Sequence, residues 1–327
     1  MRHFFVLLFF LLLFPSFPGY TQSFSWNAGY DGFLDNREYF TIDNPQTIFG
    51  ARAWGELGAD IATDHRFRVG LNYLYELGAN ATDYLPDVTM YYRYDNRKFD
   101  FYIGSFPRRS LLTNSLAFLS DTLNYFRPNI HGTYLGYSGK GWRQYVFIDW
   151  TSRQSEERYE RFIFGTAGHV HFGSFFIENY LLMAHLAGKA IVEPGFHLRD
   201  NGGFNVNAGM DLSDYLPLDT LMFKAGALVS LDRIRGVDPG WQTPAGFLGQ
   251  LEARYKSVGI SGLYYIGQGH TFFYGDPFYK LNNYGRLDLY LMPLRTSFVN
   301  LKINFILHFA KGQVDYSQQL LLILKLK

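Results

Sequence analysis

Two histidines two positions apart are the first residues of this chain whose type and spacing could do chemistry. His169 and His171 would point to the same face of a strand, and with a nearby carboxylate they could bind a metal ion. No third ligand follows at a useful spacing, and the chain has no cysteine, which excludes thiolate sites and cysteine nucleophiles. We expect neither a metal site nor a cofactor.

A serine nucleophile supported by a histidine and an acid is the second chemistry to consider. The stretch from His197 to Gly202 resembles the histidine, serine and asparagine stretch of outer-membrane phospholipases, but it lacks the serine that would act as the nucleophile. No other Ser/His/Asp arrangement has local support, and Gly202 and Gly203 are predicted to form a turn. The residues therefore predict a protein that is not an enzyme.

Charged residues recur at alternate positions along the chain, where they would share the inner face of a β-barrel. The predicted pore-lining residues are Arg52, Glu56, Arg66, Arg68, Glu76, Arg93, Asp95, Asp100, Arg161, Lys224, Glu252, Arg254, Arg286, Asp288 and Lys302. Asp60 and Asp211 share the same face, so nine basic and eight acidic residues nearly balance. They favour a hydrated wall of paired charges over a pore selective for one sign of ion. The alternative is a basic ladder on the first strands that guides anionic or sugar-like solutes.

One long segment, Phe106 to Asn129, combines arginines with apolar residues that would sit poorly in open water. We predict that it folds into or over the lumen as a constriction, and an outer cap or a partner-binding surface is the alternative. The predicted constriction residues are Arg108, Arg109, Leu116, Phe118 and Arg127. A second candidate gate, Gln268 to Gly285, is crowded with Tyr and Phe, which could pack on each other or stack on sugar rings.

Strands must position these residues, because polar and apolar side chains alternate with a period of two. Between residues 66 and 77, Arg66 and Arg68 alternate with Phe67 and Val69, and the pattern recurs between residues 299 and 309. A helix could not place such residues on two clean faces. One strand face could therefore meet lipid while the other meets water.

Composition narrows the class of protein further. The 327 residues include 25 Tyr and 32 Phe, and 30 basic residues nearly cancel 29 acidic ones, so nucleic acid is not an expected partner. After residue 20 no apolar run approaches the ~20 residues that a membrane-spanning helix needs. A basic start, an apolar run from Phe4 to Phe14 and a turn-forming stretch predict a signal peptide over residues 1–21, followed by one domain over residues 22–327.

Short turns and long loops alternate along the chain, as they do in outer-membrane barrels. With Leu34–Thr47 and Gly188–Gly203 taken as long loops, the count is about 16 strands, and 14 to 18 are allowed. The even number depends on residues 191–199 forming a loop. The predicted fold class is all-β, a transmembrane antiparallel up-and-down β-barrel.

In this pattern the chain resembles the porin-like outer-membrane β-barrels of Gram-negative bacteria. The stretch from Asp35 to Phe40 also looks similar to one in alginate-export-like porins. The resemblance implies an outer-membrane location, contact with outer-membrane lipid, passage of small hydrophilic solutes and, in many relatives, a homo-trimer.

Three functions are compatible with these observations. The leading hypothesis is a porin-like channel for passive or facilitated diffusion of small hydrophilic solutes. The second is a structural or assembly barrel with a plugged lumen that binds a partner outer-membrane protein. The third is a lipid-modifying barrel enzyme.

Overall fold

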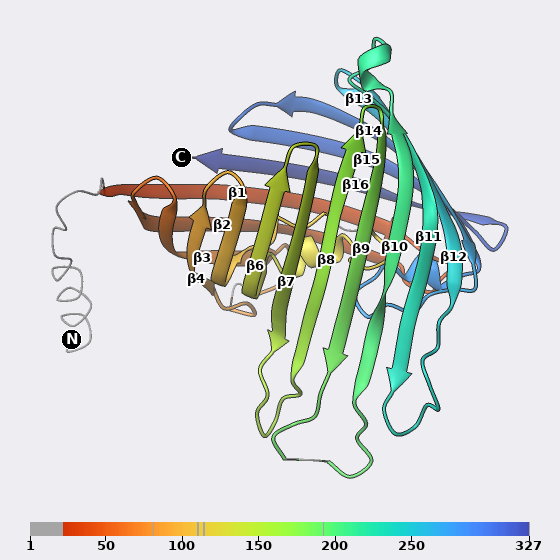
Figure 1. The fold of residues 1–327 in the computed structure, drawn as a ribbon, viewed down its shortest axis with the longest axis horizontal. Coiled ribbons are helices and arrows are strands. Elements are labelled where there is room, and N and C mark those ends of the chain that lie inside the picture. The colour runs from red at the N-terminus through yellow and green to blue at the C-terminus, as the bar shows by residue number, and fades with distance from the viewer. Residues whose placement is uncertain (1–21, 81, 110, 114, 192, 327) are drawn as a thin grey trace.

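The computed structural model describes residues 22–80, 82–109, 111–113, 115–191 and 193–326, so the predicted signal peptide lies outside the described residues. Sixteen antiparallel strands form one closed barrel (Figure 1), which confirms the predicted fold class and strand number. The strands are β1 (Gln22–Glu38), β2 (Gln46–Ile61), β3 (His65–Glu76), β4 (Asp87–Asp95), β5 (Phe99–Pro107), β6 (Asn129–Gly139), β7 (Trp142–Ser152), β8 (Arg161–Phe172), β9 (Phe175–Leu186), β10 (Arg199–Asp211), β11 (Thr220–Ile234), β12 (Ala245–Tyr255), β13 (Val258–Gly267), β14 (Asn283–Arg295), β15 (Val299–Ala310) and β16 (Gln313–Leu326).

The first and last strands close the barrel. β1 pairs with β16 from Ala28 opposite Leu326 to Glu38 opposite Tyr316, so β1 begins and β16 ends at the same end of the barrel (Figure 1). Closure leaves no unpaired sheet edge, which a lipid environment would penalise heavily. Most of the short turns lie at this end and the long loops lie at the other, where the turn between β15 and β16 (residues 311–312) is a short exception. We call that other end the outer end, because the short turns of such barrels face the periplasm.

Alternation along each strand separates the two faces of the wall. On β2, Arg52 is 2% exposed and Glu56 7% exposed, whereas Phe49 and Leu57 are about half exposed. The polar residues face the lumen and the apolar residues face outward, where lipid replaces water in the membrane. This is the arrangement that the period-two pattern predicts.

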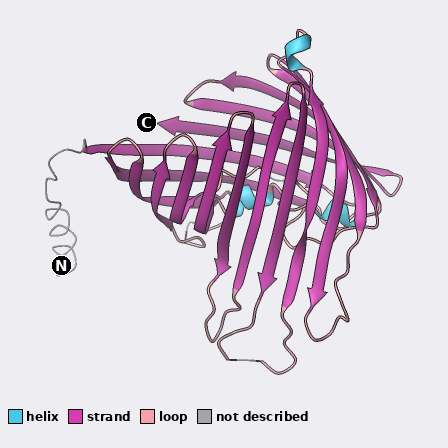
Figure 2. Ribbon diagram, in the orientation of Figure 1, coloured by secondary structure: helices cyan, strands magenta, loops and turns pink. Residues whose placement is uncertain are grey.

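The helices of the described residues are short pieces between strands (Figure 2). They are α2 (Thr122–Phe126) and the 3₁₀ helices η1 (Ser213–Tyr215) and η2 (Pro277–Lys280). None of them has the length and apolar character needed to cross a membrane. α2 and η2 lie in the two long loops that the sequence singles out as candidate gates.

Two predicted loop boundaries are wrong. β1 continues to Glu38, whereas the polar run that begins at Asp35 predicts that the loop from Leu34 to Thr47 has already begun. β10 begins at Arg199, so Gly202 and Gly203 lie in a strand and not in a turn. Their small size is needed there, because a Cβ atom at Gly202 would come within 2.0 Å of the Leu182 carbonyl oxygen.

Candidate functional site

The luminal wall carries paired charges. By strand alternation the predicted pore-lining residues point inward, and several form ion pairs: Arg68 with Asp60 at 2.6 Å, Arg93 with Asp95 at 2.6 Å and with Asp100 at 3.2 Å. Others are Arg66 with Asp95, Lys224 with Glu178, Arg254 with Asp219 and Arg286 with Asp288. Some of these pairs join neighbouring strands, as Arg68 and Asp60 do, and others lie within one strand, as Arg286 and Asp288 do. Opposite charges across neighbouring strands stabilise the sheet.

The remaining predicted pore-lining residues have other partners or none of this kind. Glu56 accepts a hydrogen bond from the Tyr91 hydroxyl at 3.1 Å, and Glu252 accepts one from Tyr290 at 2.9 Å. Glu76 accepts one from Tyr84, and Arg52 donates to the Asn124 and Tyr125 carbonyl oxygens. Lys302 lies over the Tyr290 ring, 4.5 Å from its centre, and Arg161 lies at the exposed start of β8.

The β5–β6 loop (residues 108–128) lies against the inner wall. Arg108 forms an ion pair with Asp149 of β7, Arg109 lies 3.1 Å from Asp31 of β1, and Arg127 donates to the Thr151 carbonyl oxygen at 3.0 Å. These contacts reach opposite parts of the wall, so the loop crosses the lumen.

The β13–β14 loop (residues 268–282) meets the β5–β6 loop inside the barrel. The rings of Phe118 and Phe272 pack edge to face with their centres 4.6 Å apart, and the Asp276 amide donates to the Leu116 carbonyl oxygen at 2.9 Å. Phe118 and Phe272 belong to one buried apolar cluster that includes inward residues of strands β5 to β9. The two loops therefore fill much of the outer half of the lumen.

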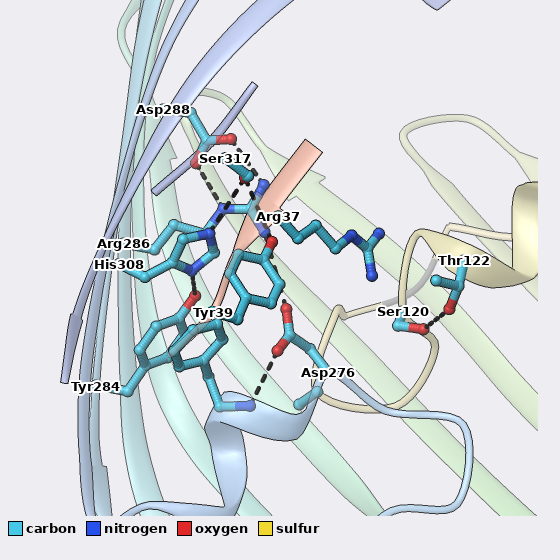
Figure 3. Close-up of polar contacts among 12 residues, drawn as sticks. Arg37, Tyr39, Ser120, Thr122, Asp276, Tyr284, Arg286, Asp288, His308 and Ser317 are labelled. Carbon is cyan, nitrogen blue, oxygen red and sulfur yellow. Dashed lines mark hydrogen bonds and ion pairs between the residues drawn. The ribbon is translucent and has the colours of Figure 1, made fainter. Parts of the chain in front are cut away.

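A polar cluster lines the wall beside these loops (Figure 3). Arg286 donates two hydrogen bonds to Asp288 at 2.7 Å, and the Tyr284 hydroxyl lies 2.8 Å from His308 Nδ1. His308 Nε2 lies 3.5 Å from Ser317 Oγ. A serine beside a histidine is the layout of an activated nucleophile, but Ser317 and His308 are both completely buried. A lipid could not reach this pair without opening the cluster.

Another histidine, His185, has an acidic partner. His185 Nδ1 lies 2.6 Å from Asp200 Oδ1, and Arg235 Nε donates to Asp200 Oδ2 at 2.6 Å. β9 and β10 pair so that His185 stands directly opposite Asp200. Among the described residues, this is the one pair of a histidine and a carboxylate whose atoms lie within ion-pair distance.

Strand alternation places this pair on the outward face. The neighbours Ala184 and Asn201 are buried toward the lumen, and Asn201 donates to the Thr271 carbonyl oxygen of the β13–β14 loop. His185 and Asp200 must then point outward. Both lie where β9 ends and β10 begins, next to the long loops of the outer end.

Two outward aromatic residues, Phe162 and Trp150, lie in a row beside His185. The Phe162 ring centre lies 4.9 Å from that of His185, and the Trp150 ring centre lies 5.2 Å from that of Phe162. Trp150 also donates its indole N–H to Glu160 at 3.1 Å. Trp150 combines an apolar ring with a polar N–H, as the residues of the aromatic girdles at the two membrane interfaces of a barrel do, and we infer that the pair lies near the outer interface.

Sequence reasoning missed both members of this pair. Asp200 fell inside the predicted loop from Gly188 to Gly203, and His185 was not considered. The signal that could have found it is a histidine on the lipid-facing parity, after Leu181 and Met183. The predicted pair His169 and His171 has ring centres 5.1 Å apart, and the described residues form no group of three or more candidate metal ligands.

Comparisons with known proteins give the fold and the family separately. A loop-deletion mutant of OmpT from Vibrio cholerae has a TM-score of 0.58 at 9% identity, over 93% of this chain and 99% of that one. The trimer form of OmpT gives 0.56 at 9% identity over 94% and 100%, and a mutant of the Rh. blastica porin gives 0.52 at 12% identity over 93% and 100%. No curated protein matches the sequence.

The family comparison corrects one prediction. The model of the lipid A 3′-O-deacylase-type family matches residues 18–325, and this is an enzyme family, so the expectation that the protein is not an enzyme is wrong. That expectation rested on the lack of a serine near a histidine in the sequence, and residues that meet only through the pairing of strands, as His185 and Asp200 do, cannot be found in that way. The chain is an outer-membrane β-barrel with a porin-like fold, and it belongs to the lipid A 3′-O-deacylase-type family.

Proposed function

We propose that this protein hydrolyses an acyl ester of lipid A in the outer leaflet of the outer membrane. The observation that carries the proposal is the 2.6 Å contact between His185 and Asp200 on the outward face of the barrel, at the outer interface. An ester of a membrane lipid lies at that level, between the headgroup and the acyl chains. The family match supports the choice of lipid A as substrate.

The pair can act as a general base on water. With its Nδ1–H donated to Asp200, the neutral imidazole leaves Nε2 free to accept a proton. A water molecule that gives its proton to Nε2 attacks the ester carbonyl carbon. The bond between that acyl carbon and the sugar oxygen then breaks, and the imidazolium returns the proton to the sugar oxygen as it leaves. The products are a fatty acid and the lipid with one free hydroxyl group.

Arg235 supplies positive charge beside the pair. Its side chain is about half exposed, and only its Nε–H is needed for Asp200. The other guanidinium N–H groups can donate to anionic groups, including those of a lipid headgroup. Arg235 is therefore proposed to orient the substrate, and Asp200 to hold His185 in the required tautomer.

The experiment is an ester hydrolysis assay on purified protein reconstituted into vesicles that contain lipid A. Mass spectrometry is expected to show lipid A that has lost one acyl chain with the wild type and not with His185→Ala. The matched control is His65→Ala, because His65 is also an outward-facing histidine but lies at the opposite end of the barrel, hydrogen-bonded to Tyr92 at 2.7 Å. Full activity in His185→Ala would contradict the proposal.

The likeness to porins supports a second candidate, diffusion of small hydrophilic solutes through the lumen. The luminal ion pairs suit a hydrated wall, whereas the two loops inside the barrel oppose an open path. Single-channel recording in planar bilayers tests it. A homo-trimer and a partner outer-membrane protein also stay predictions, and chemical cross-linking in native membranes would reveal either.

A further inference from the structure

A cavity of about 480 Å³ lies in the lumen between the β5–β6 loop and the inward faces of β14, β15 and β16. Its size falls within the roughly 300–1,000 Å³ of typical small-molecule sites. The proposed ester site lies on the outward face of β9 and β10, so this cavity is a separate feature.

One part of the lining offers hydrogen bonds that the described residues do not use. Arg108 is 3% exposed, and its Nη1 has no partner although its Nη2 contacts Asp149. Lys302 forms no ion pair with a described carboxylate and rests on the Tyr290 ring. A buried cationic donor without a partner is costly, so a bound anion would remove a penalty as well as form new contacts.

The carboxylates of the lining are unequal. Both oxygens of Asp288 accept hydrogen bonds from Arg286, which neutralises that charge. Asp121, beside α2, also lines the cavity and would repel an anion at its own position. An anionic group is therefore expected near Lys302 and Arg108, away from Asp121.

The rest of the lining is apolar. The β5–β6 loop contributes Leu112, Leu116 and Leu119, and β16 contributes Leu321 and Ile323. These two β16 residues break the rule of a polar inner face, because Leu320 and Leu322 already provide the outward apolar row. Apolar side chains that line a cavity in the lumen favour an apolar ligand.

We propose that this cavity binds a medium-chain carboxylate, a molecule of the fatty-acid class. Its carboxylate accepts hydrogen bonds from Arg108 and Lys302, and its alkyl chain packs on Leu116 and Leu321. Binding requires no ester hydrolysis, so the inference goes beyond the proposed function and stands apart from it.

The test is equilibrium dialysis of labelled octanoate against the full chain in nanodiscs, with empty nanodiscs as the blank for partition into lipid. One octanoate per chain is expected, and octanol, acetate and inorganic phosphate are each expected to bind at least tenfold more weakly, since each lacks either the charge or the alkyl chain. Octanol, acetate or phosphate that binds as tightly as octanoate would overturn the proposal. The proposal would also be overturned if the protein showed no saturable octanoate binding beyond that of the empty nanodiscs.

Variants separate the two parts of the site. Lys302→Gln is expected to weaken octanoate binding about tenfold, and Lys224→Gln, which removes a luminal lysine outside the cavity, is expected to leave it unchanged. Leu116→Trp and Leu321→Phe each reduce the cavity from a different element and are both expected to abolish binding. Unchanged affinity in Lys302→Gln and in both filling variants would overturn the proposal. His185→Ala should bind octanoate normally, which distinguishes this site from the ester site.

Discussion

His185 Nδ1 lies 2.6 Å from Asp200 Oδ1 on the outward face, although the two residues are 15 positions apart in the chain. The antiparallel register of β9 and β10 sets them opposite each other, within a ladder that runs to Met210 opposite Phe175. Strands hold catalytic geometry more firmly than loops do. The barrel wall therefore holds His185 beside Asp200 in the orientation that the proposed general base needs.

Asp200→Asn is expected to lower the rate of ester hydrolysis by on the order of 100-fold, because an amide no longer stabilises the imidazolium and can hold the ring in the wrong tautomer. The rate of fatty-acid release from lipid A vesicles measures the effect. Glu160→Gln is the matched control, since it removes a carboxylate at the same interface that contacts Trp150 and not His185. Equal loss in both variants would mean that interface charge matters and the histidine pair does not.

Stability is expected to fall on acidification because of His270 in the β13–β14 loop. This ring is 1% exposed and contacts Ser230 Oγ at 3.0 Å, and burial lowers its pKa to about 4 from an ordinary value of 6.5. The unfolded chain then binds more protons than the folded chain between those values. The stabilisation by neutral His270 is present above about pH 6.5 and is lost as the pH falls toward about 4.

The measurement is the thermal unfolding midpoint at pH 7.5 and at pH 5. The drop in the midpoint is expected to be smaller in His270→Gln, because glutamine does not titrate. A drop of the same size in the variant would place the acid sensitivity elsewhere.

Arg108→Met is expected to reduce the free energy of unfolding by about 3–5 kcal/mol, because it leaves the fully buried Asp149 without its cation. Arg66→Met is the control. Its ion pair with Asp95 is 3.4 Å long and both side chains are 28% exposed, so its removal should cost about 1 kcal/mol or less. Guanidinium unfolding in detergent compares the two variants, and similar losses would show that the luminal loop contact is not buried as described.

Replacing residues 111–126 with a short Gly/Ser linker is expected to raise single-channel conductance severalfold, because the segment crosses the lumen. The linker is feasible, since the Arg108 amide already donates to the Pro128 carbonyl oxygen at 2.7 Å. Shortening the external loop at residues 79–86 provides the control and should leave conductance unchanged. No gain in conductance would mean that other residues close the lumen.

The sequence was sufficient to predict on which face of its strand a residue lies, because successive side chains point alternately to the lumen and to the lipid. Arg68 and Phe67 could be assigned to opposite faces from their positions alone. Loop ends were harder: the run from Asp35 to Glu38 is as polar as a loop, yet it continues β1, with Asp35 and Arg37 buried on the luminal face. Polarity cannot distinguish a loop from the inner face of a barrel.

The candidate site was out of reach for a different reason. His185 and Asp200 meet only through the register of two strands, and that register depends on where β10 begins. With Arg199 to Gly203 taken as loop, Asp200 had no partner to be assigned. The two luminal loops were recognised as unusual from their aromatic and leucine content, but the contact between Phe118 and Phe272 depends on the closed barrel around them.

Chemical rescue of His185→Gly is the sharpest test of the proposed general base, with fatty-acid release from lipid A vesicles measured with and without added imidazole. We expect little release by the variant alone and a rise that saturates with imidazole, because the free base occupies the space left beside Asp200. If His185→Gly releases fatty acid at the wild-type rate without imidazole, or if the wild type releases none, His185 is not the general base of an ester hydrolase.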